Sequence, residues 1–293
     1  MQRLNHHVFT EPEQVMENIK FVAEHLEKKA FSDKILKPIP TKDGQLFFKE
    51  ETGNYWRVFP FFAKTSTFET VKNAAQAYEA ARAYGAFSKA LADIDIEQLH
   101  LTIPHFHDGI RRMRLFETAL KAASENKIGQ AILEIQFTIT HCDIFQKIAD
   151  LELPVRVTHN DTKISNILFD WKGENALAVI DWDTIMPGTV LSDFGDMVRT
   201  FANTGEEDAT NLEEVKAQPE IVEALLKGYL EEMEAVLTPL EKDNLLLGAK
   251  WITLMQAMRF LTDFLENDVY YKTEYIGHNW VRARNQIALF KSL

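Results

Sequence analysis

The chain has 293 residues, of which 46% are hydrophobic and 26% are charged, as in an ordinary globular protein with a sizeable core. Its net charge is −12 and it has no long basic cluster, which argues against nucleic acid as a partner. No apolar run approaches the length of a membrane span, so no membrane partner is expected either.

The first predicted elements are one helix and two short strands. Thr10 and Glu13 have the spacing of a capping box, and Pro12 suits the first helical turn. Apolar residues then recur at helical spacing, at Val15, Ile19, Val22 and Leu26. Residues 45–62, QLFFKEETGNYWRVFPFF, predict two short strands joined by a turn near Thr52 to Asn54.

The rest of the chain is predicted to be mainly helical. Helical spacing is found at about 67–93, 109–123, 127–150, 193–202, 218–235, 238–267 and 279–291. Before residue 193 lie three apolar segments typical of strands, PVRVTH, NILFD and ALAVID, the last two separated by the turn Trp171 to Asn175. We place a boundary near Ala63 to Ser66, which divides the chain into a small mixed part, 1–64, and a mainly helical part, 65–293.

The stretch between residues 155 and 200 has the most informative polar residues. His159-x-Asp161-x4-Asn166 lies between two apolar strands, and Asp181 follows the apolar run that ends at Ile180. A loop that carries Asp and Asn, followed by an Asp on the next hairpin strand, can bring three oxygen-bearing side chains together. The alternative interpretation is structural, because turns rich in Asp and Asn between buried strands are common.

This pattern suits phosphoryl transfer, in which positioning and charge neutralisation do most of the work. One carboxylate must orient the acceptor hydroxyl and take its proton, the role predicted for Asp161. A carboxamide and a second carboxylate, Asn166 and Asp181, can hold Mg²⁺ through oxygen atoms. Lys163 can add positive charge beside the transferred phosphoryl group.

The motif H-x-D-x4-N followed by an apolar strand ending in I-D resembles the aminoglycoside phosphotransferase and choline kinase superfamily. Longer segments are similar to the N-acetylhexosamine 1-kinase group: THNDTKISNILFD, IDWDTIMPG, LSDFGDMVR, IPHFHD, MRFLTDFLENDVYY and HNWVRARNQ. The resemblance covers nearly the whole chain. The superfamily motif indicates the type of reaction, and the longer segments indicate the acceptor.

The resemblance implies an α+β, protein-kinase-like fold with two lobes: a truncated small N-terminal lobe and a mainly helical C-terminal lobe that carries a short catalytic hairpin. It implies ATP and Mg²⁺ as cofactors, Asp161 as the base for the sugar anomeric hydroxyl, and Asn166 and Asp181 as magnesium ligands. It gives His159 and Asp193 supporting roles. Asp193 begins a DFG-like triplet, but Asp181 holds the metal-binding place, so Asp193 is expected to brace the catalytic loop.

The resemblance also implies contacts for both substrates. Phe59, Phe61 and Phe62 follow the second early strand, where the hinge between the lobes meets adenine in the family. The functional groups there would be those of the backbone. Arg259 and Tyr270 match positions that contact the hexosamine.

The start of the chain departs from the family. Kinase-like folds cover the ATP phosphates with a flexible, usually Gly-rich loop near the start of the N-terminal lobe. This chain has no G-x-G spacing, and its first residues, MQRLN, resemble the third strand of that lobe. We expect that the sequence starts late relative to the family. A natural short form and a form without activity are the alternatives.

The leading hypothesis is ATP-dependent phosphorylation of an N-acetylhexosamine such as GlcNAc or GalNAc. The alternatives are another small hydroxyl acceptor (choline, homoserine, methylthioribose or an aminoglycoside) and an inactive kinase-like binding protein. A sulfatase-like hydrolase is excluded, because the single cysteine, Cys142, lies in HCDIFQK and not in a C-x-P-x-R signature. A chain with one cysteine and no signal-peptide pattern is expected in the cytoplasm. The sequence leaves the oligomeric state open.

Overall fold

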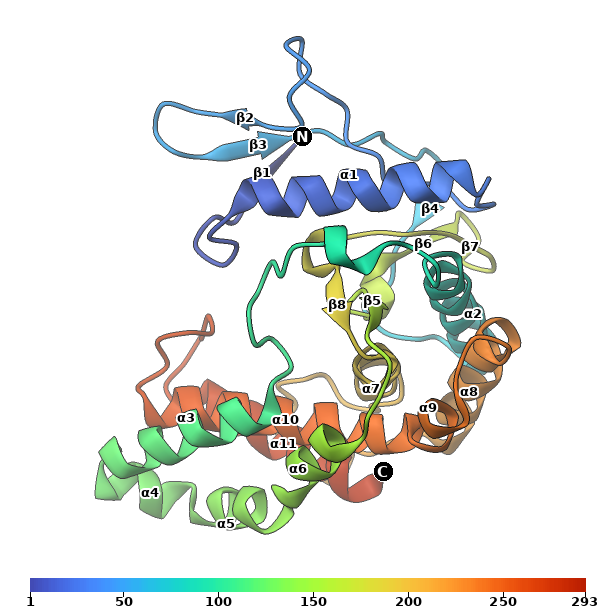
Figure 1. The fold of residues 1–293 in the computed structure, drawn as a ribbon. Helices are drawn as coiled ribbons and strands as arrows, with labels where there is room; N and C mark the ends of the chain where they lie inside the picture. The colour runs from blue at the N-terminus through green and yellow to red at the C-terminus, as the bar shows by residue number, and fades with distance from the viewer.

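Helix α1 (Pro12–Lys28) and a three-stranded antiparallel sheet form the N-terminal part of the molecule (Figure 1). The computed structural model describes residues 1–293. The sheet has the order β1-β3-β2, with β1 at Gln2–Leu4, β2 at Phe48–Lys49 and β3 at Tyr55–Arg57. In the register of the β1–β3 pair, Gln2 lies opposite Arg57. The predicted pair of early strands and the turn between them are confirmed.

Two further small sheets lie between α1 and the helices below it (Figure 1). One has the order β4-β6-β7, with β4 at Thr65–Ser66, β6 at Ile167–Asp170 and β7 at Ala176–Val179. The other pairs β5 (Arg156–Thr158) with β8 (Met186–Gly188). The β6–β7 pair is the predicted hairpin. Strand β8 was not predicted from the sequence.

Helices dominate the remainder of the chain and the lower part of Figure 1. They are α2 (Ala74–Ala90), α3 (Gly109–Ala122), α4 (Glu125–Gln130), α5 (Ile132–His141), α6 (Asp143–Asp150), α7 (Val190–Phe201), α8 (Pro219–Met233), α9 (Pro239–Asp243), α10 (Leu245–Leu265) and α11 (His278–Ser292). Short 3₁₀ turns lie at Ile96–Gln98, Ile164–Asn166 and Trp182–Thr184. Helix α2 packs against α8, and α10 packs against α7, α3 and α11. None of these helices combines the length and the hydropathy needed to span a membrane.

One continuous core joins the N-terminal part to the helical part. It includes Met16 and Ile19 of α1 as well as Phe260 of α10. Two glycines allow α7 and α10 to approach closely within this core. Gly195 of α7 lies against the carbonyl of Gly248 of α10, and a Cβ atom at Gly248 would lie 2.6 Å from the carbonyl oxygen of Leu191. No residue with a side chain fits there without displacing backbone.

The predicted capping box of α1 is wrong. Glu11 is the N-cap residue, no side chain caps the helix, and Pro12 is its first residue. Glu13 instead accepts a hydrogen bond from the Tyr55 hydroxyl at 3.2 Å, so its carboxylate is engaged away from the helix end. The apolar stripe of the helix is confirmed, because its four residues are all buried: Val15, Ile19, Val22 and Leu26.

Three predicted helices have different limits in the structure. The helix expected from residue 67 begins only with α2, because the Asn73 side chain caps it by accepting the Gln76 backbone N–H at 3.0 Å. The segment 127–150 is divided into α4, α5 and α6, and the first break follows Gly129, a poor helix former. The segment 238–267 is divided at Asn244, whose side chain donates to the Leu240 carbonyl at 2.8 Å and competes with the helical backbone bonds.

Candidate active site

Asp193 holds the loop that follows β5 in place. Its carboxylate accepts the backbone N–H of His159 at 2.8 Å and that of Asn160 at 2.7 Å. The Thr162 hydroxyl donates to the Asp193 carbonyl at 2.6 Å. Burial raises the pKa of the Asp193 carboxyl to about 6, although the nearby His159 and the two backbone N–H groups oppose that shift. Asp193 therefore fixes the backbone of the loop, and its side chain is fully engaged in doing so.

His159 joins the same loop to the end of the β6–β7 hairpin. Its Nδ1 atom accepts the Asp161 backbone N–H at 3.3 Å, so its Nε2 atom carries the proton and donates to the Ile180 carbonyl at 2.9 Å. Its own carbonyl accepts the Thr184 hydroxyl at 2.6 Å. The buried imidazole is thus a structural link between the two segments that carry the predicted catalytic residues.

Asp161, Lys163 and Asn166 contact one another directly. The Asp161 Oδ2 atom lies 2.9 Å from Lys163 Nζ and accepts a hydrogen bond from Asn166 Nδ2 at 2.9 Å. Asn166 Nδ2 also donates to the Asp161 carbonyl at 2.8 Å. Burial raises the pKa of the Asp161 carboxyl, but the charge and the hydrogen bond of Lys163 outweigh this effect and hold that pKa below its usual range. Asp161 is therefore ionised at neutral pH.

Asp181 lies at the end of the hairpin, next to the residue whose backbone N–H donates to the Asn166 carbonyl at 2.9 Å. Its backbone is left-handed, with φ 62°, which turns the chain sharply after β7. Burial, then the negative charges of Asp183 and Asp161, raise the pKa of the Asp181 carboxyl. Carboxylates placed close together in this way favour a bound cation.

The chemistry of these donors fits a magnesium ion with few protein ligands. Because Asn166 uses its Nδ2 atom on Asp161, its Oδ1 atom remains available, and the Asp181 carboxylate accepts no hydrogen bond. No group of three His, Cys, Asp or Glu residues in the chain is placed to hold a metal ion. Mg²⁺ commonly takes one or two protein ligands and completes its shell with water and phosphate oxygens.

An ion pair connects this region to the N-terminal part. Arg57 of β3 contacts both carboxylate oxygens of Asp183, at 2.5 and 2.8 Å. Its Nε atom donates to the Gln2 side chain at 3.2 Å, and its guanidinium lies 5.0 Å from the centre of the Phe59 ring. The carboxylate of Asp183 is thus bound by arginine, whereas that of Asp181 is free.

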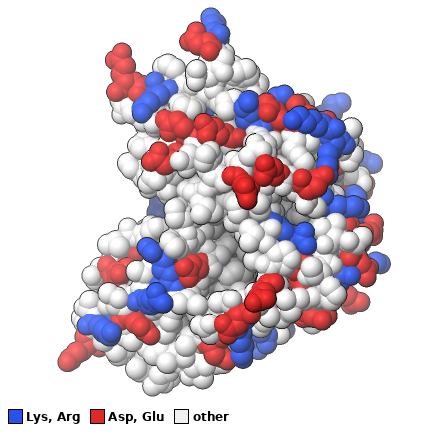
Figure 2. Space-filling model, viewed as in Figure 1, with Lys and Arg blue, Asp and Glu red and all other residues white.

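A cleft of about 780 Å³ joins the predicted hinge to the hairpin. Phe59, Phe61 and Phe62 line it together with Asn166 and Asp181. The Phe61 side chain is 91% exposed, whereas Phe59 and Phe62 pack against the core. The face drawn in Figure 2 is hollowed between the part that contains α1 and the helices below, and the floor of the hollow carries few charged groups.

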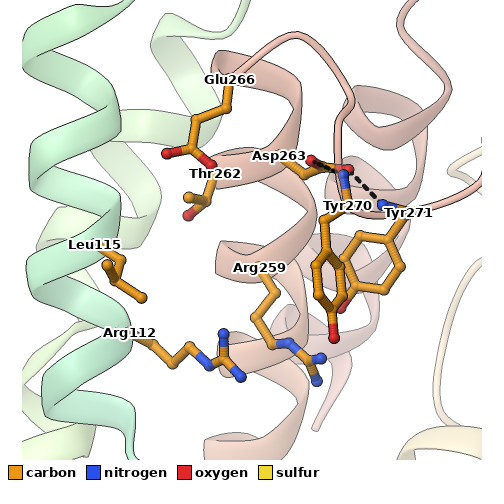
Figure 3. A pocket seen from close by; sticks show the side chains of 8 residues that line it. All are labelled: Arg112, Leu115, Arg259, Thr262, Asp263, Glu266, Tyr270 and Tyr271. Carbon is orange, nitrogen blue, oxygen red and sulfur yellow. Dashed lines mark hydrogen bonds between the residues drawn. The ribbon is translucent and has the colours of Figure 1, made fainter. Parts of the chain in front are cut away.

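The other two predicted substrate residues, Arg259 and Tyr270, lie in a separate pocket of about 220 Å³ (Figure 3). Arg259 comes from α10 and Arg112 comes from α3, and Figure 3 shows their guanidinium groups side by side. Asp263 shapes the pocket, because its carboxylate accepts the backbone N–H groups of Tyr270 and Tyr271 at 2.8 and 2.9 Å. The pocket has no direct contact with Asp161.

Sequence reasoning did not single out Arg57, Arg112 or Tyr84. The Tyr84 hydroxyl donates to the Lys163 carbonyl at 2.8 Å, which supports the predicted catalytic loop from α2. Arg57 and Arg112 belong to no motif, and their importance comes from residues far away in the sequence. Only the position of Arg57 among aromatic strand residues, YWRVF, could have drawn attention to it.

The predicted hinge segment, Asn166 of the predicted catalytic loop and Asp181 of the hairpin line one cleft, an arrangement that suits a kinase-like phosphotransferase. Residues 16–239 match the family model described as the phosphotransferase enzyme family. The chain belongs to this family, as the sequence predicted.

Solved structures with the same fold include two phosphotransferases and a kinase. An aminoglycoside phosphotransferase from Alicyclobacillus acidocaldarius has a TM-score of 0.65 at 11% identity, over 96% of this chain and 82% of that one. A spectinomycin phosphotransferase in complex with ADP and spectinomycin has a TM-score of 0.60 at 13% identity, over 97% and 84% of the two chains. An ethanolamine kinase from Plasmodium vivax has a TM-score of 0.52 at 14% identity, over 94% and 73%. The predicted kinase-like α+β fold is confirmed.

Proposed function

We propose that this chain transfers the γ-phosphoryl group of ATP to a hydroxyl group of a small molecule, and that the favoured acceptor is the anomeric hydroxyl of an N-acetylhexosamine. Asp161 is the base, Lys163 stabilises developing negative charge, and Asn166 and Asp181 hold Mg²⁺. The observation that carries the proposal is the contact of one Asp161 oxygen with both Lys163 and Asn166, close to the free carboxylate of Asp181.

The geometry of Asp161 suits a base. Both of its side-chain contacts engage Oδ2, which leaves Oδ1 to accept a hydrogen bond from the acceptor hydroxyl. The lowered pKa keeps the carboxylate ionised, so it can take the hydroxyl proton as the oxygen forms its bond to phosphorus and ADP leaves. The ammonium group of Lys163, whose pKa Asp161 raises against the effect of burial, remains charged beside the reacting groups.

The nucleotide is proposed to occupy the cleft that Phe59, Phe61 and Phe62 share with Asn166 and Asp181. Backbone groups of the hinge segment would meet the adenine, which makes the identity of these side chains secondary. When bound, Mg²⁺ supplies positive charge against the phosphate oxygens. Asn166 Oδ1 and the Asp181 carboxylate are its proposed protein ligands.

Arg259 and Tyr270 are proposed to bind the acceptor. Their pocket contains two guanidinium groups, of Arg112 and Arg259, and so it disfavours a cationic acceptor such as choline or an aminoglycoside. An oxygen-rich sugar suits it better. A binding protein without catalysis needs no base, so the Asp161 arrangement supports an enzyme over that alternative.

The test is ATP turnover with Mg²⁺ and a panel of hexosamines and amino alcohols, followed by detection of the phosphorylated product. We expect Asp161→Asn to lower kcat by at least about 100-fold, because a general base contributes at least that much. Nucleotide binding should change little. Asp243→Asn is the matched control, since Asp243 is exposed on α9 and its side chain makes no hydrogen bond or ion pair.

Full activity of a correctly folded Asp161→Asn variant would show that the base is assigned wrongly. Absence of turnover with every acceptor would contradict the proposed enzyme. Turnover of amino alcohols alone would leave the phosphotransferase in place and reject the hexosamine.

A further inference from the structure

The pair of arginines in Figure 3 has no anionic partner within the protein. Neither Arg112 nor Arg259 forms an ion pair with any carboxylate. The Arg112 guanidinium makes no hydrogen bond, and its buried Nε atom has no partner. Arg259 donates only to the Gln256 side chain, at 3.1 Å, and otherwise lies against aromatic rings.

The acidic residues of the pocket do not neutralise this pair. The Asp263 carboxylate is occupied by the backbone N–H groups of Tyr270 and Tyr271 and by the Asn279 side chain, which donates at 2.8 Å. Glu266 is exposed, and in Figure 3 it lies well away from both guanidinium groups. Two positive charges therefore remain side by side and uncompensated in a half-buried site.

The electrostatic consequences are visible in neighbouring groups. Burial and then the charge of Arg259 lower the pKa of the Arg112 guanidinium. Burial and then the charges of Arg259 and Arg112 lower the pKa of His107 to about 3. Unpaired charge in a partly buried site is costly, so an anion that pairs with both guanidinium groups would stabilise the site.

Arg259 is linked to the loop of the proposed base through Phe106. The Arg259 guanidinium is 5.5 Å from the centre of the Phe106 ring. Phe106 in turn lines a cavity of about 240 Å³ together with Asn160, the residue before the proposed base. Phe106 thus lies next to Arg259 and also lines the cavity beside Asn160.

We infer that Arg112 and Arg259 bind an oxyanion carried by the acceptor, so that among N-acetylhexosamines the enzyme prefers one that bears an acidic group. This inference rests on the proposed function, because it takes the acceptor to be a sugar. Guanidinium groups bind carboxylate and phosphate oxygens through paired, charge-assisted hydrogen bonds. The Arg112 guanidinium, which lines the pocket and makes no hydrogen bond in the protein, gains partners when the anion binds.

Binding to the full chain in the presence of ADP and Mg²⁺ tests this inference by calorimetry. The probes are N-acetylglucosamine, its 6-phosphate, and the corresponding sugar with a carboxylate at C6. We expect at least one acidic probe to bind about 10- to 100-fold more tightly than the neutral sugar, with a preference that weakens at high salt. Comparison of the two acidic probes distinguishes a phosphate from a carboxylate.

Arg112→Gln should remove the preference for the acidic probe, and Arg259→Gln should also weaken it. Arg111→Gln is the matched control, because it removes the same charge from the adjacent, exposed position on α3 and should keep the preference. Unchanged ADP binding and melting temperature establish that each variant is folded. The inference fails if neither acidic probe binds more tightly than the neutral sugar, or if the preference survives in Arg112→Gln.

The two proposals fail in different ways. Phosphorylation of N-acetylglucosamine without any preference for the acidic probes rejects the oxyanion site and leaves the proposed function in place. Tight binding of an acidic probe that depends on Arg112, without phosphorylation of any probe, supports the oxyanion site and rejects the proposed function.

Discussion

The ion pair between Arg57 and Asp183 offers a quantitative test of how the N-terminal part is held to the catalytic region. Arg57 is 6% exposed and Asp183 is 15% exposed, and their two contacts at 2.5 and 2.8 Å form a bidentate pair. Asp183→Asn removes one charge and leaves the other buried. Loss of one partner of a buried pair costs about 3–5 kcal/mol, so we expect the free energy of unfolding to fall by this amount.

The double variant Arg57→Met/Asp183→Asn provides the decisive comparison. It removes both charges, and therefore it should lower the free energy of unfolding by less than the sum of the losses in the two single variants. We expect a coupling energy of at least about 2 kcal/mol, near the upper end for residues in contact. Of the two single variants, Arg57→Met should lower the free energy of unfolding more, because it also loses the Gln2 hydrogen bond and the contact with the Phe59 ring.

Urea unfolding followed by tryptophan fluorescence is a suitable assay, because Trp56 and Trp182 are the sequence neighbours of the two charged residues. Asp243→Asn again serves as the control for the loss of an exposed carboxylate. Single effects that add within about 0.5 kcal/mol in the double variant would mean that the pair contributes no specific stability, and the reasoning would be refuted.

Three further outcomes are expected. The pKa of Asp193 is about 6 in the fold and 3.8 ordinarily, so its protonation stabilises the native state fully below about pH 4, and this contribution is lost as the pH rises through 6. The test compares the free energy of unfolding of the wild type with that of Asp193→Asn. The wild-type value minus the variant value should increase by up to roughly 3 kcal/mol as the pH is lowered from 7 to 4. A difference that does not change with pH would contradict this prediction. Gly248→Ala should destabilise the protein by about 1–3 kcal/mol, because its Cβ would lie 2.6 Å from the Leu191 carbonyl oxygen; an unchanged melting temperature would disprove the close approach. Asp181→Asn should raise the Mg²⁺ concentration needed for half-maximal turnover, and an identical requirement would remove Asp181 from the proposed metal ligands.

The parts of the site that could be predicted are close together in the sequence. Asp161, Asn166 and Asp181 lie on one loop and the adjacent hairpin, and strand signals on both sides bring them near one another. Asp193 begins the next helix and reaches back to the same loop. The local sequence pattern is sufficient to predict this part of the site, because short connections limit how far apart these residues can lie.

The parts that could not be predicted depend on distant contacts or on side chains that interrupt helices. Arg57 and Asp183 are separated by 126 positions. Arg112 and Arg259 come from α3 and α10, which the pattern of each helix alone does not bring together. The break at Asn244 depends on a side-chain hydrogen bond to the backbone, whereas periodicity reports only which face of a helix is apolar.

The glycine crossing of α7 and α10 has a consequence for the acceptor. Helix α7 holds the catalytic loop through Asp193, and α10 carries Arg259. Since Gly195 and Gly248 press backbone against backbone, the two helices cannot slide past each other without a clash. They therefore fix the distance between the two ends of the proposed acceptor site. A molecule whose hydroxyl and charged group are spaced too closely or too widely could engage only one end, so its length would decide whether it reacts.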